Sequence, residues 1–247
     1  MSYQPTHFNK LPADLVLNKD DANKIEPYVF SEDIVILVDV ALATGRPLLV
    51  SGNPGCGKSQ LAYAIAAAQG WSLLRKTITS RTHPESLTVE VDQLRRLNDA
   101  QARGEDAGLK PDAAYYLNPG IFWWAFQPQT ARRRGMESTA ADKLKVNLSY
   151  PGVERGDPHQ HAVLLIDEID KAEPDLPNDL LEPLDECSFS LPDGYRVGGK
   201  ARIVAEKGME LLIVITTNGE RELPQAFLRR CVLLKLPVKW QQTWNHL

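Results

Sequence analysis

The sequence is poor in cysteine and has no long apolar run, and both absences exclude classes of protein. Only three cysteines occur, Cys56, Cys187 and Cys231, with no C-x-x-C pair and no Cys/His cluster. These features argue against a disulfide scaffold and a zinc site, and they favour reduced thiols in a cytoplasmic protein. Without a run of about 18 apolar residues, we expect no membrane-spanning helix. The polar N-terminal residues do not resemble a secretion signal.

Neither sign of charge dominates the chain. The 28 Lys and Arg residues against 32 Asp and Glu residues give a formal net charge of -4. This mild acidity argues against a dedicated nucleic-acid binder, whose domain would usually be basic. Hydrophobic residues make up 43% of the 247 residues, which excludes wholesale disorder. The length allows one large domain or two small ones, with a core that needs no covalent staple.

Five short apolar runs alternate with helical patterns along the chain. Each run is continuously apolar, which is typical of parallel strands covered on both faces. The first predicted helix follows Ser31, which can cap its start, and ends at Gly45. We therefore predict an α/β protein, a three-layer αβα fold with a five-stranded, mainly parallel sheet. The predicted strands occupy residues 46–52, 71–79, 161–170, 209–218 and 231–238.

Residues 81–160, between the second and third predicted strands, are the least regular part of the chain. Leu87, Val91 and Leu94 recur at helical spacing and indicate a helix there. An aromatic group further on could stack on bases or grip a polypeptide, although core packing is the simpler interpretation. Its members are Tyr115, Tyr116, Phe122, Trp123, Trp124 and Phe126. The basic run 132–134 suits a solvated loop better than a phosphate site.

Residues 52–59, GNPGCGKS, match the pattern G-x-x-x-x-G-K-[ST] in full. The segment follows a predicted strand and opens a predicted helix, where successive backbone N–H groups and the helix N-terminus form an anion site. We expect Lys58 to reach the β- and γ-phosphates of a nucleotide and the Ser59 hydroxyl to ligate Mg²⁺. The predicted nucleotide-binding residues are Gly52, Asn53, Pro54, Gly55, Cys56, Gly57, Lys58, Ser59 and Gln60.

Two later strands end in polar residues. Asp167 and Glu168 close the third predicted strand, and Asn218 closes the fourth. Asp167 would hold Mg²⁺ through its water shell, and Glu168 would orient and deprotonate the water that attacks the γ-phosphate. Asn218 would lie beside the γ-phosphate, because ligands gather at the carboxyl ends of parallel strands. Strands often end in polar residues for purely structural reasons, so the phosphate loop is what favours a functional interpretation.

Arg229 and Arg230 close a short predicted helix before the last strand. An arginine delivered to a neighbouring subunit's γ-phosphate would stabilise transition-state charge. The alternative is an exposed helix C-terminus, where cations are favourable on electrostatic grounds.

These segments together resemble the AAA+ ATPases. GNPGCGKS, LLIDEID, ITTN and LPQAFLRRC occur in the order of Walker A, Walker B, sensor 1 and arginine finger. The chain is similar to the MoxR branch in two further segments, residues 118–122 (NPGIF) and 223–230 (LPQAFLRR). The resemblance implies ATP and Mg²⁺ as ligands, a ring of identical subunits, and Arg230 as the finger with Arg229 as the alternative.

The chain departs from the family pattern in two places. Lys58 and Asp167 lie further apart than in a compact AAA+ core, so we expect an inserted element at about residues 81–160. The sequence also ends soon after the fifth predicted strand, so the resemblance implies that the helical lid with its sensor 2 arginine is absent. We divide the chain into a lead-in (1–30), an αβα nucleotide-binding domain (31–240) and a tail (241–247).

The functional expectation is a Mg²⁺-dependent ATPase that drives chaperone-like remodelling of a protein client in the cytoplasm. One alternative is an ATP-dependent switch with little turnover, which a missing lid favours. A second is a P-loop kinase, against which Glu168 and the late arginines argue. ATP is preferred to GTP because the guanine-type motif Asn18-Lys19-x-Asp21 precedes the phosphate loop, whereas in GTPases it follows.

Overall fold

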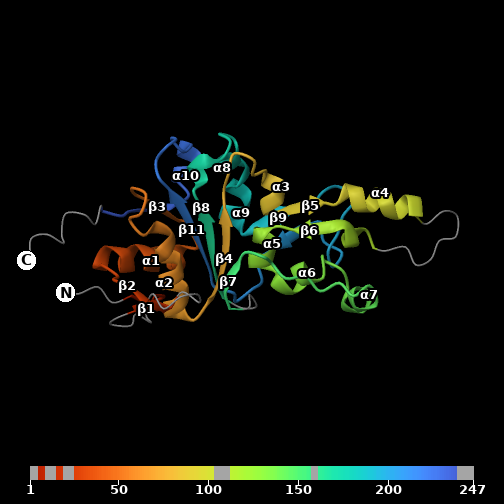
Figure 1. Ribbon diagram of the computed structural model, residues 1–247, viewed down its shortest axis with the longest axis horizontal. Helices are drawn as coiled ribbons and strands as arrows, with labels where there is room; N and C mark the ends of the chain where they lie inside the picture. Colours follow the sequence, from red (N-terminus) through yellow and green to blue (C-terminus); the bar gives the residue numbers. More distant parts are fainter. Residues whose placement is uncertain (1–4, 9–14, 19–24, 103–111, 157–160, 238–247) are drawn as a thin grey trace, which may run out of the picture.

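A central six-stranded sheet organises the computed structural model (Figure 1), which describes residues 5–8, 15–18, 25–102, 112–156 and 161–237. Five neighbouring strands run parallel, as predicted, and β7 adds an antiparallel edge beside β4. The sixth strand was not expected, because three residues carry too little pattern to indicate a strand. In spatial order the strands are β12 (Val232–Lys235), β3 (Leu48–Ser51), β11 (Leu211–Thr217), β8 (Ala162–Asp167), β4 (Ser72–Thr77) and β7 (Val153–Arg155).

Two helices cover one face of the sheet, α1 (Glu32–Thr44) and α2 (Lys58–Gln69). Their apolar sides pack on alternate strand residues such as Leu48 and Leu165, which are fully buried. The predicted end of the first helix is correct, because Gly45 takes the left-handed conformation with φ of 65°. The predicted cap is wrong in its chemistry: Ser31 occupies the N-cap position, but its side chain makes no capping hydrogen bond.

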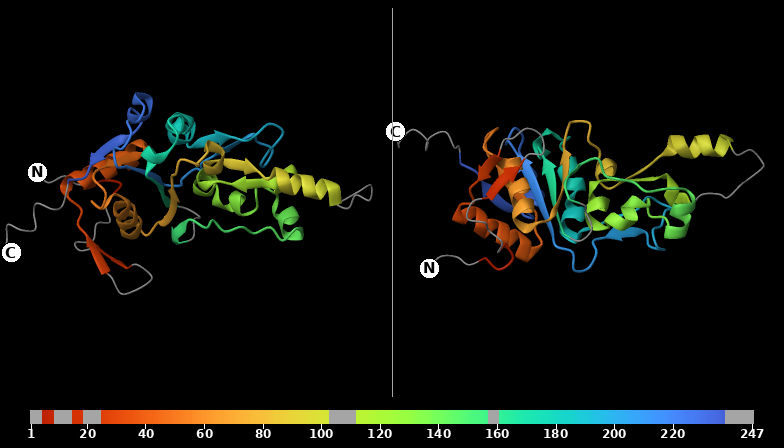
Figure 2. Two further views of the ribbon diagram at one scale, coloured as in Figure 1. Left: turned by 45° about the horizontal axis from the view of Figure 1, so that its top comes forward. Right: turned by 60° about the horizontal axis from the view of Figure 1, so that its bottom comes forward.

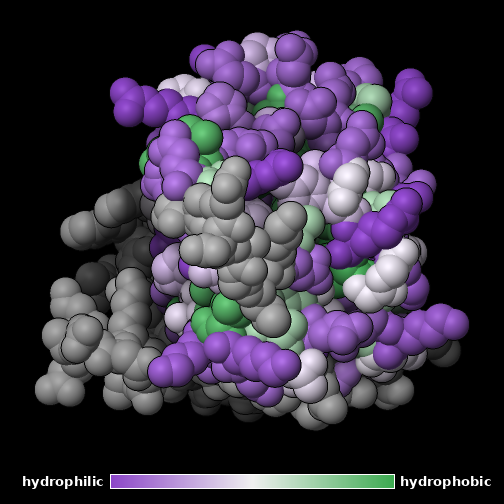
Figure 3. Space-filling model, turned by 90° about the vertical axis from the view of Figure 1, so that its right-hand side faces the viewer, coloured by the Kyte–Doolittle hydropathy of each residue, from purple (hydrophilic) through white to green (hydrophobic). Residues whose placement is uncertain are grey.

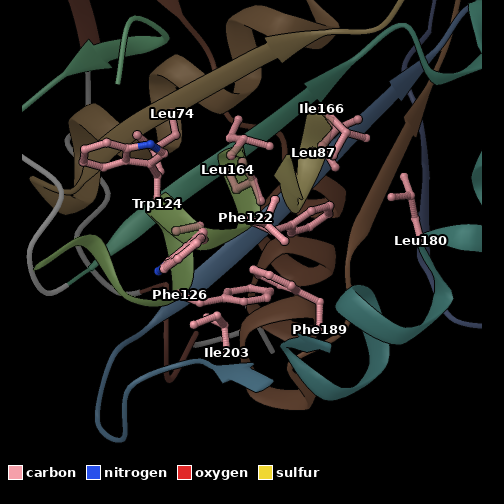
Figure 4. Packing of buried hydrophobic residues seen from close by; sticks show 14 of the residues in the cluster. Leu74, Leu87, Phe122, Trp124, Phe126, Leu164, Ile166, Leu180, Phe189 and Ile203 are labelled. Carbon is pink, nitrogen blue, oxygen red and sulfur yellow. The ribbon is translucent and has the colours of Figure 1, made fainter. Parts of the chain in front are cut away.

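The opposite face is covered by α5 (Ile121–Phe126), α9 (Leu181–Glu186) and the strand pair β9 (Ser188–Ser190) and β10 (Arg202–Val204). Figure 4 shows Phe122, Phe126 and Phe189 packed together beneath the strand residues Leu164 and Ile166. Trp123 and Trp124 are buried in the same cluster. The interpretation of these aromatic residues as core is therefore confirmed, and they do not offer an exposed stacking surface.

The region between β4 and β8 forms a lobe beside the sheet rather than a simple connection (Figure 1). Its β5 and β6 pair antiparallel, and α4 extends from this pair away from the rest of the chain (Figure 2). The end of the molecule that carries α4 and α7 is mostly hydrophilic, with apolar groups in small scattered areas among its described residues (Figure 3). The elements are α3 (Pro84–Leu87), β5 (Val89–Val91), α4 (Gln93–Ala102), η1 (Ala113–Tyr116), β6 (Leu117–Pro119), α6 (Pro128–Arg132) and α7 (Ser138–Lys143).

The helix predicted through Leu87, Val91 and Leu94 is interrupted. The β-branched segment Val89–Val91 forms a strand instead, because it pairs with β6. The close approach that permits this pairing is at Gly120, where an added Cβ would lie 2.4 Å from the carbonyl carbon of Leu87. Tertiary pairing has overridden the local helical spacing.

The described part of the N-terminal lead-in lies beside α2. It includes the antiparallel pair β1 (Leu15–Asn18) and β2 (Ile25–Tyr28). Phe8 is fully buried, and its backbone N–H donates to the buried carboxylate of Asp39 on α1 at 2.7 Å. The predicted tail 241–247 and residues 19–21 of the guanine-type motif lie outside the described residues. Among those described, no helix combines the length and apolarity that crossing a membrane requires.

Candidate functional site

The carboxyl ends of three parallel strands bring the predicted site residues to one edge of the sheet. Ser51 at the end of β3 pairs with Thr217 at the end of β11, and β11 lies directly beside β8. The phosphate loop, the Asp167–Glu168 pair and Asn218 therefore emerge side by side. These three groups are remote in sequence, and the strand order alone makes them neighbours.

A cavity of about 450 Å³ opens at this edge. Most of the predicted nucleotide-binding and catalytic residues line it, whereas Gly52 and Asn53 belong to the same loop without lining the cavity. Tyr28 and Thr216 also line it, and no sequence pattern assigned a role to either residue. The lining residues are Tyr28, Pro54, Gly55, Cys56, Gly57, Lys58, Ser59, Gln60, Asp167, Glu168, Thr216 and Asn218.

The phosphate loop curls back on itself and leads directly into α2. Gly57 has a φ of 92°, a left-handed conformation that a side chain would strain, and its carbonyl accepts the N–H of Leu61 at 3.0 Å. The Lys58 side chain is buried, and its Nζ donates to the carbonyls of Gly52 at 2.8 Å and Asn53 at 3.0 Å. The lysine thus closes the loop, and its ammonium lies on the wall of the cavity.

Asp167 is the most heavily hydrogen-bonded carboxylate of the cavity. Its Oδ1 accepts from the Ser59 hydroxyl at 2.8 Å and from the Thr216 hydroxyl at 2.6 Å. Its Oδ2 forms an ion pair with the guanidinium of Arg75 on β4 at 2.7 Å. Burial lowers the pKa of Arg75, but the hydrogen bond and charge of Asp167 outweigh that effect and leave the pKa above its ordinary value.

The donor set beside Asp167 suits a small hard cation. Ser59 and Asp167 offer hydroxyl and carboxylate oxygens within one hydrogen-bond length of each other, and Mg²⁺ prefers such ligands, completing its shell with water and phosphate oxygens. Among the described residues no group of three or more His, Cys, Asp and Glu side chains is placed to hold a metal ion.

Glu168 is held in an unusual conformation at the end of β8. Its φ of 63° and ψ of 50° are left-handed, which is costly for a residue with a side chain. The backbone N–H donates to the Thr216 hydroxyl at 2.8 Å. The carboxylate forms an ion pair with Lys171 at 2.7 Å, and this hydrogen bond raises the pKa of Lys171.

Asn218 is anchored by a carboxylate that sequence reasoning missed. Asp170 is buried, and its Oδ2 accepts the backbone N–H groups of Asn218 and Glu220, both at 3.0 Å. The signal that could have found it is the third acidic residue of the DEID segment. Burial of a carboxylate is costly unless it is hydrogen-bonded, and here its partners belong to the loop after β11.

Tyr28 brings the N-terminal lead-in to the cavity. Its ring lies 5.2 Å from that of Phe30, which in turn lies 5.4 Å from Phe8. Burial, followed by the nearby Cys56, raises the pKa of Tyr28 well above its ordinary range, so its hydroxyl remains protonated. A single tyrosine that precedes the phosphate loop by more than 20 residues matches no nucleotide-binding pattern, which is why the prediction missed it.

The two candidate finger residues lie away from this cavity. They follow α10 (Gln225–Leu228) and precede Val232, which pairs with Leu48 at the opposite end of β3 from the phosphate loop. The Arg230 side chain is committed to Asp185, in an ion pair, and to the carbonyl of Ala226 at 2.9 Å. Arg229 is exposed, and among the described residues its side chain forms no hydrogen bond or ion pair.

Comparison with known proteins agrees with this geometry. The sequence profile of the AAA domain (dynein-related subfamily) matches residues 47–231. This chain therefore belongs to the AAA ATPase-domain family, and the AAA+ resemblance expected from the motif order is confirmed. A comparison with the curated proteins finds none that matches.

Among solved structures, the chain is similar to a crystal structure described as "a putative ATPase" from Cytophaga hutchinsonii. The two share 16% sequence identity with a TM-score of 0.42. The match covers 82% of this chain and 44% of that one, so this chain spans less than half of that protein's length.

Proposed function

We propose that this AAA domain binds ATP together with Mg²⁺ at the cavity and hydrolyses it. The observation that carries the proposal is the convergence of Lys58, Ser59, Asp167 and Glu168 on one cavity at the carboxyl edge of the sheet. The phosphate loop offers backbone N–H groups at the start of α2, and the buried ammonium of Lys58 adds a positive charge. This arrangement is suited to the β- and γ-phosphates of a nucleotide.

Each remaining side chain has a role that its position supports. Ser59 and Asp167 would hold Mg²⁺, which neutralises the charge that develops on the phosphates. Once its carboxylate is released from the ion pair with Lys171, Glu168 would orient and deprotonate the attacking water. Asn218, whose backbone is fixed by Asp170, would contact that water or the γ-phosphate. Tyr28 would lie against the nucleotide on the side of the lead-in.

The arginine finger would act on a neighbouring copy of the chain. Both arginines precede β12, at the end of the sheet opposite the phosphate loop, and a strand of four residues separates the two ends by roughly 13 Å. The sequence pattern favours Arg230. The geometry favours Arg229, because Arg230 already pairs with Asp185 within its own chain.

Assembly into a ring would place the finger beside the nucleotide of a neighbouring subunit. ATP turnover would then change the shape of a protein client. The similarity of this chain's motifs to the MoxR branch supports this role. A second candidate function is an ATP-dependent switch with little turnover of its own. The ion pair between Glu168 and Lys171 favours it, because the carboxylate must leave the ammonium before it can contact an attacking water.

Phosphate release by the purified chain, measured beside binding of a non-hydrolysable ATP analogue, tests the proposal. Glu168→Gln should retain binding and lose roughly a hundredfold or more of the turnover. Glu210→Gln is the matched control, because Glu210 is exposed and lies at the other end of the sheet, beside His161. Both chains should bind the analogue equally, while Glu210→Gln keeps wild-type turnover.

The same measurements separate the alternatives. A chain that binds neither ATP nor its analogue contradicts the proposal as a whole. Binding without turnover, even at protein concentrations that drive assembly, supports the switch. ATP consumption that depends on a phosphorylatable acceptor supports a kinase, and turnover that survives Glu168→Gln contradicts the assignment of the base.

A further inference from the structure

Arg75 reaches the predicted metal-binding carboxylate from the neighbouring strand. In the parallel pairing of β4 with β8, Arg75 lies opposite Leu165, two residues before Asp167. Both side chains project toward the face that α2 covers, since Leu73 and Leu165 belong to the same buried cluster. A long side chain can span such a diagonal, and the guanidinium meets Asp167 Oδ2 at 2.7 Å.

The surroundings of Arg75 hold its guanidinium in place. The Tyr63 hydroxyl on α2 accepts a weaker hydrogen bond at 3.4 Å. The backbone is fixed on both sides, because the Arg75 N–H donates to Gly152 at 2.8 Å and its carbonyl accepts from the Tyr150 hydroxyl at 3.3 Å. Nε is buried and has no hydrogen-bond partner among the described residues. An unpartnered buried donor is costly, so the ion pair must compensate for it.

The contacts of Asp167 divide its two oxygens between two tasks. Oδ1 faces the Ser59 and Thr216 hydroxyls in the cavity, whereas Oδ2 faces Arg75. The side chain of Asp167 is only 5% exposed, whereas that of Arg75 is 34% exposed. A carboxylate buried this deeply needs a cation beside it, and Arg75 supplies one before any metal arrives.

We infer that Arg75 is a positioning residue of the metal site, a resident counter-cation that turns Asp167 Oδ1 toward the metal and limits how strongly nucleotide binding depends on Mg²⁺. The inference rests on the proposed function, because it concerns the same nucleotide. A fixed positive charge at Oδ2 stabilises the metal-free site and repels an arriving cation. Without that charge the buried carboxylate would depend on Mg²⁺ alone for compensation.

The experiment measures the dissociation constant of a non-hydrolysable ATP analogue in EDTA and in Mg²⁺. The ratio of the constant in EDTA to the constant in Mg²⁺ is then compared between variants. In Arg75→Met the ratio should be roughly tenfold or more above that of the wild type, mainly through weaker binding in EDTA and tighter binding in Mg²⁺. Arg75→Lys keeps the positive charge, so its ratio should stay near the wild-type value.

Arg202→Met is the matched control. Arg202 is 45% exposed, similar to Arg75, and forms ion pairs with Glu182 and Glu186 at the same distance of 2.7 Å, but it lies in the strand pair β9–β10 outside the cavity. Its loss should leave the ratio unchanged. A purely structural role for Arg75 would lower the melting temperature equally with and without Mg²⁺ and would also leave the ratio unchanged.

The outcomes separate this inference from the proposed function. Failure of the wild type to bind the analogue in both conditions contradicts the proposed function and with it the inference. Binding by the wild type with an unchanged ratio in Arg75→Met contradicts the inference alone. Should Arg75→Met and Arg75→Gln fail to fold in EDTA, the analogue with Mg²⁺ must restore folding, and failure to restore it contradicts the inference.

Discussion

Asp170 accepts the backbone N–H of Asn218 at 3.0 Å, so the acidic loop after β8 holds the polar loop after β11. The same oxygen accepts the N–H of Glu220, and the carboxylate is almost completely buried. The two loops therefore form one hydrogen-bonded unit. Displacement of either loop would move Glu168 and Asn218 relative to each other.

Removal of this anchor should affect both stability and turnover. In Asp170→Ala two backbone N–H groups lose their acceptor, so we expect the free energy of unfolding to fall by about 1–3 kcal/mol. Turnover should fall by roughly tenfold to a hundredfold because Asn218 is misplaced. Asp170→Asn keeps an accepting oxygen and should recover most of both losses. Urea unfolding and phosphate release measure the two effects, and wild-type values in Asp170→Ala would exclude an anchoring role.

Lys58→Met should weaken nucleotide binding strongly with little loss of fold. Among the described residues the ammonium donates only to the carbonyls of Gly52 and Asn53, and methionine can fill the same volume. We expect the affinity for an ATP analogue to fall by roughly a hundredfold, because a charge-assisted contact to the phosphates is lost. Isothermal titration calorimetry measures the affinity, and circular dichroism checks the fold. Unaltered affinity would place the phosphates elsewhere.

The two candidate finger residues should separate on substitution. Arg229→Ala should lower turnover by roughly a hundredfold or more and leave ATP binding intact, because its side chain is free to reach a neighbouring subunit. Arg230→Ala loses a partly exposed ion pair with Asp185, so the free energy of unfolding should fall by less than about 1 kcal/mol. Its turnover should stay within a few-fold of the wild-type value.

Mixing two inactive variants tests whether the finger acts between chains. Arg229→Ala keeps the nucleotide site, and Lys58→Met keeps the finger, so a mixture should regain part of the turnover that each lacks. Full turnover in Arg229→Ala alone would return the role to Arg230. Two inactive variants that regain no turnover on mixing would contradict action between chains.

The buried thiol of Cys231 predicts a loss of stability in alkali. Burial raises its pKa to about 12, from an ordinary value of 9.0. Below pH 9 the thiol is protonated in both the folded and unfolded states, and its stabilising contribution is fully present. Above pH 9 only the unfolded state ionises, so the free energy of unfolding should fall by roughly 1 kcal/mol between pH 9 and pH 10.

Urea unfolding at several pH values measures this loss, with Cys231→Ala as the control. The variant should show a smaller decline over the same interval, because it has no thiol to ionise at this position. Iodoacetamide should also label Cys231 slowly in the folded protein at pH 8.5, since the thiolate is the reactive form. Rapid labelling of Cys231 itself in the folded protein would contradict its burial.

Much of the site could be predicted because its parts are short and contiguous. The phosphate loop depends on glycines at set positions, on Lys58, and on a strand before and a helix after it, all within about 20 residues. Asp167, Glu168 and Asn218 were found because they end apolar strands, and parallel strands present their carboxyl ends at one edge. The lobe between β4 and β8 was expected only as an irregular region, and its strand pair was not predicted, because β5 and β6 are three residues each.

The sequence by itself determined the local chemistry: which loop can hold a phosphate, which strands are buried, and which polar residues end them. Only the tertiary structure decided which side chains from different elements meet. Tyr28 reaches the cavity from the lead-in, and Arg75 on β4 contacts Asp167 at the end of the neighbouring strand β8. Arg230 forms an ion pair with Asp185, whereas Arg229 is exposed. The physical reason is that local patterns report burial and backbone conformation. Contacts between elements depend on strand order and register, which many weak packing interactions settle together.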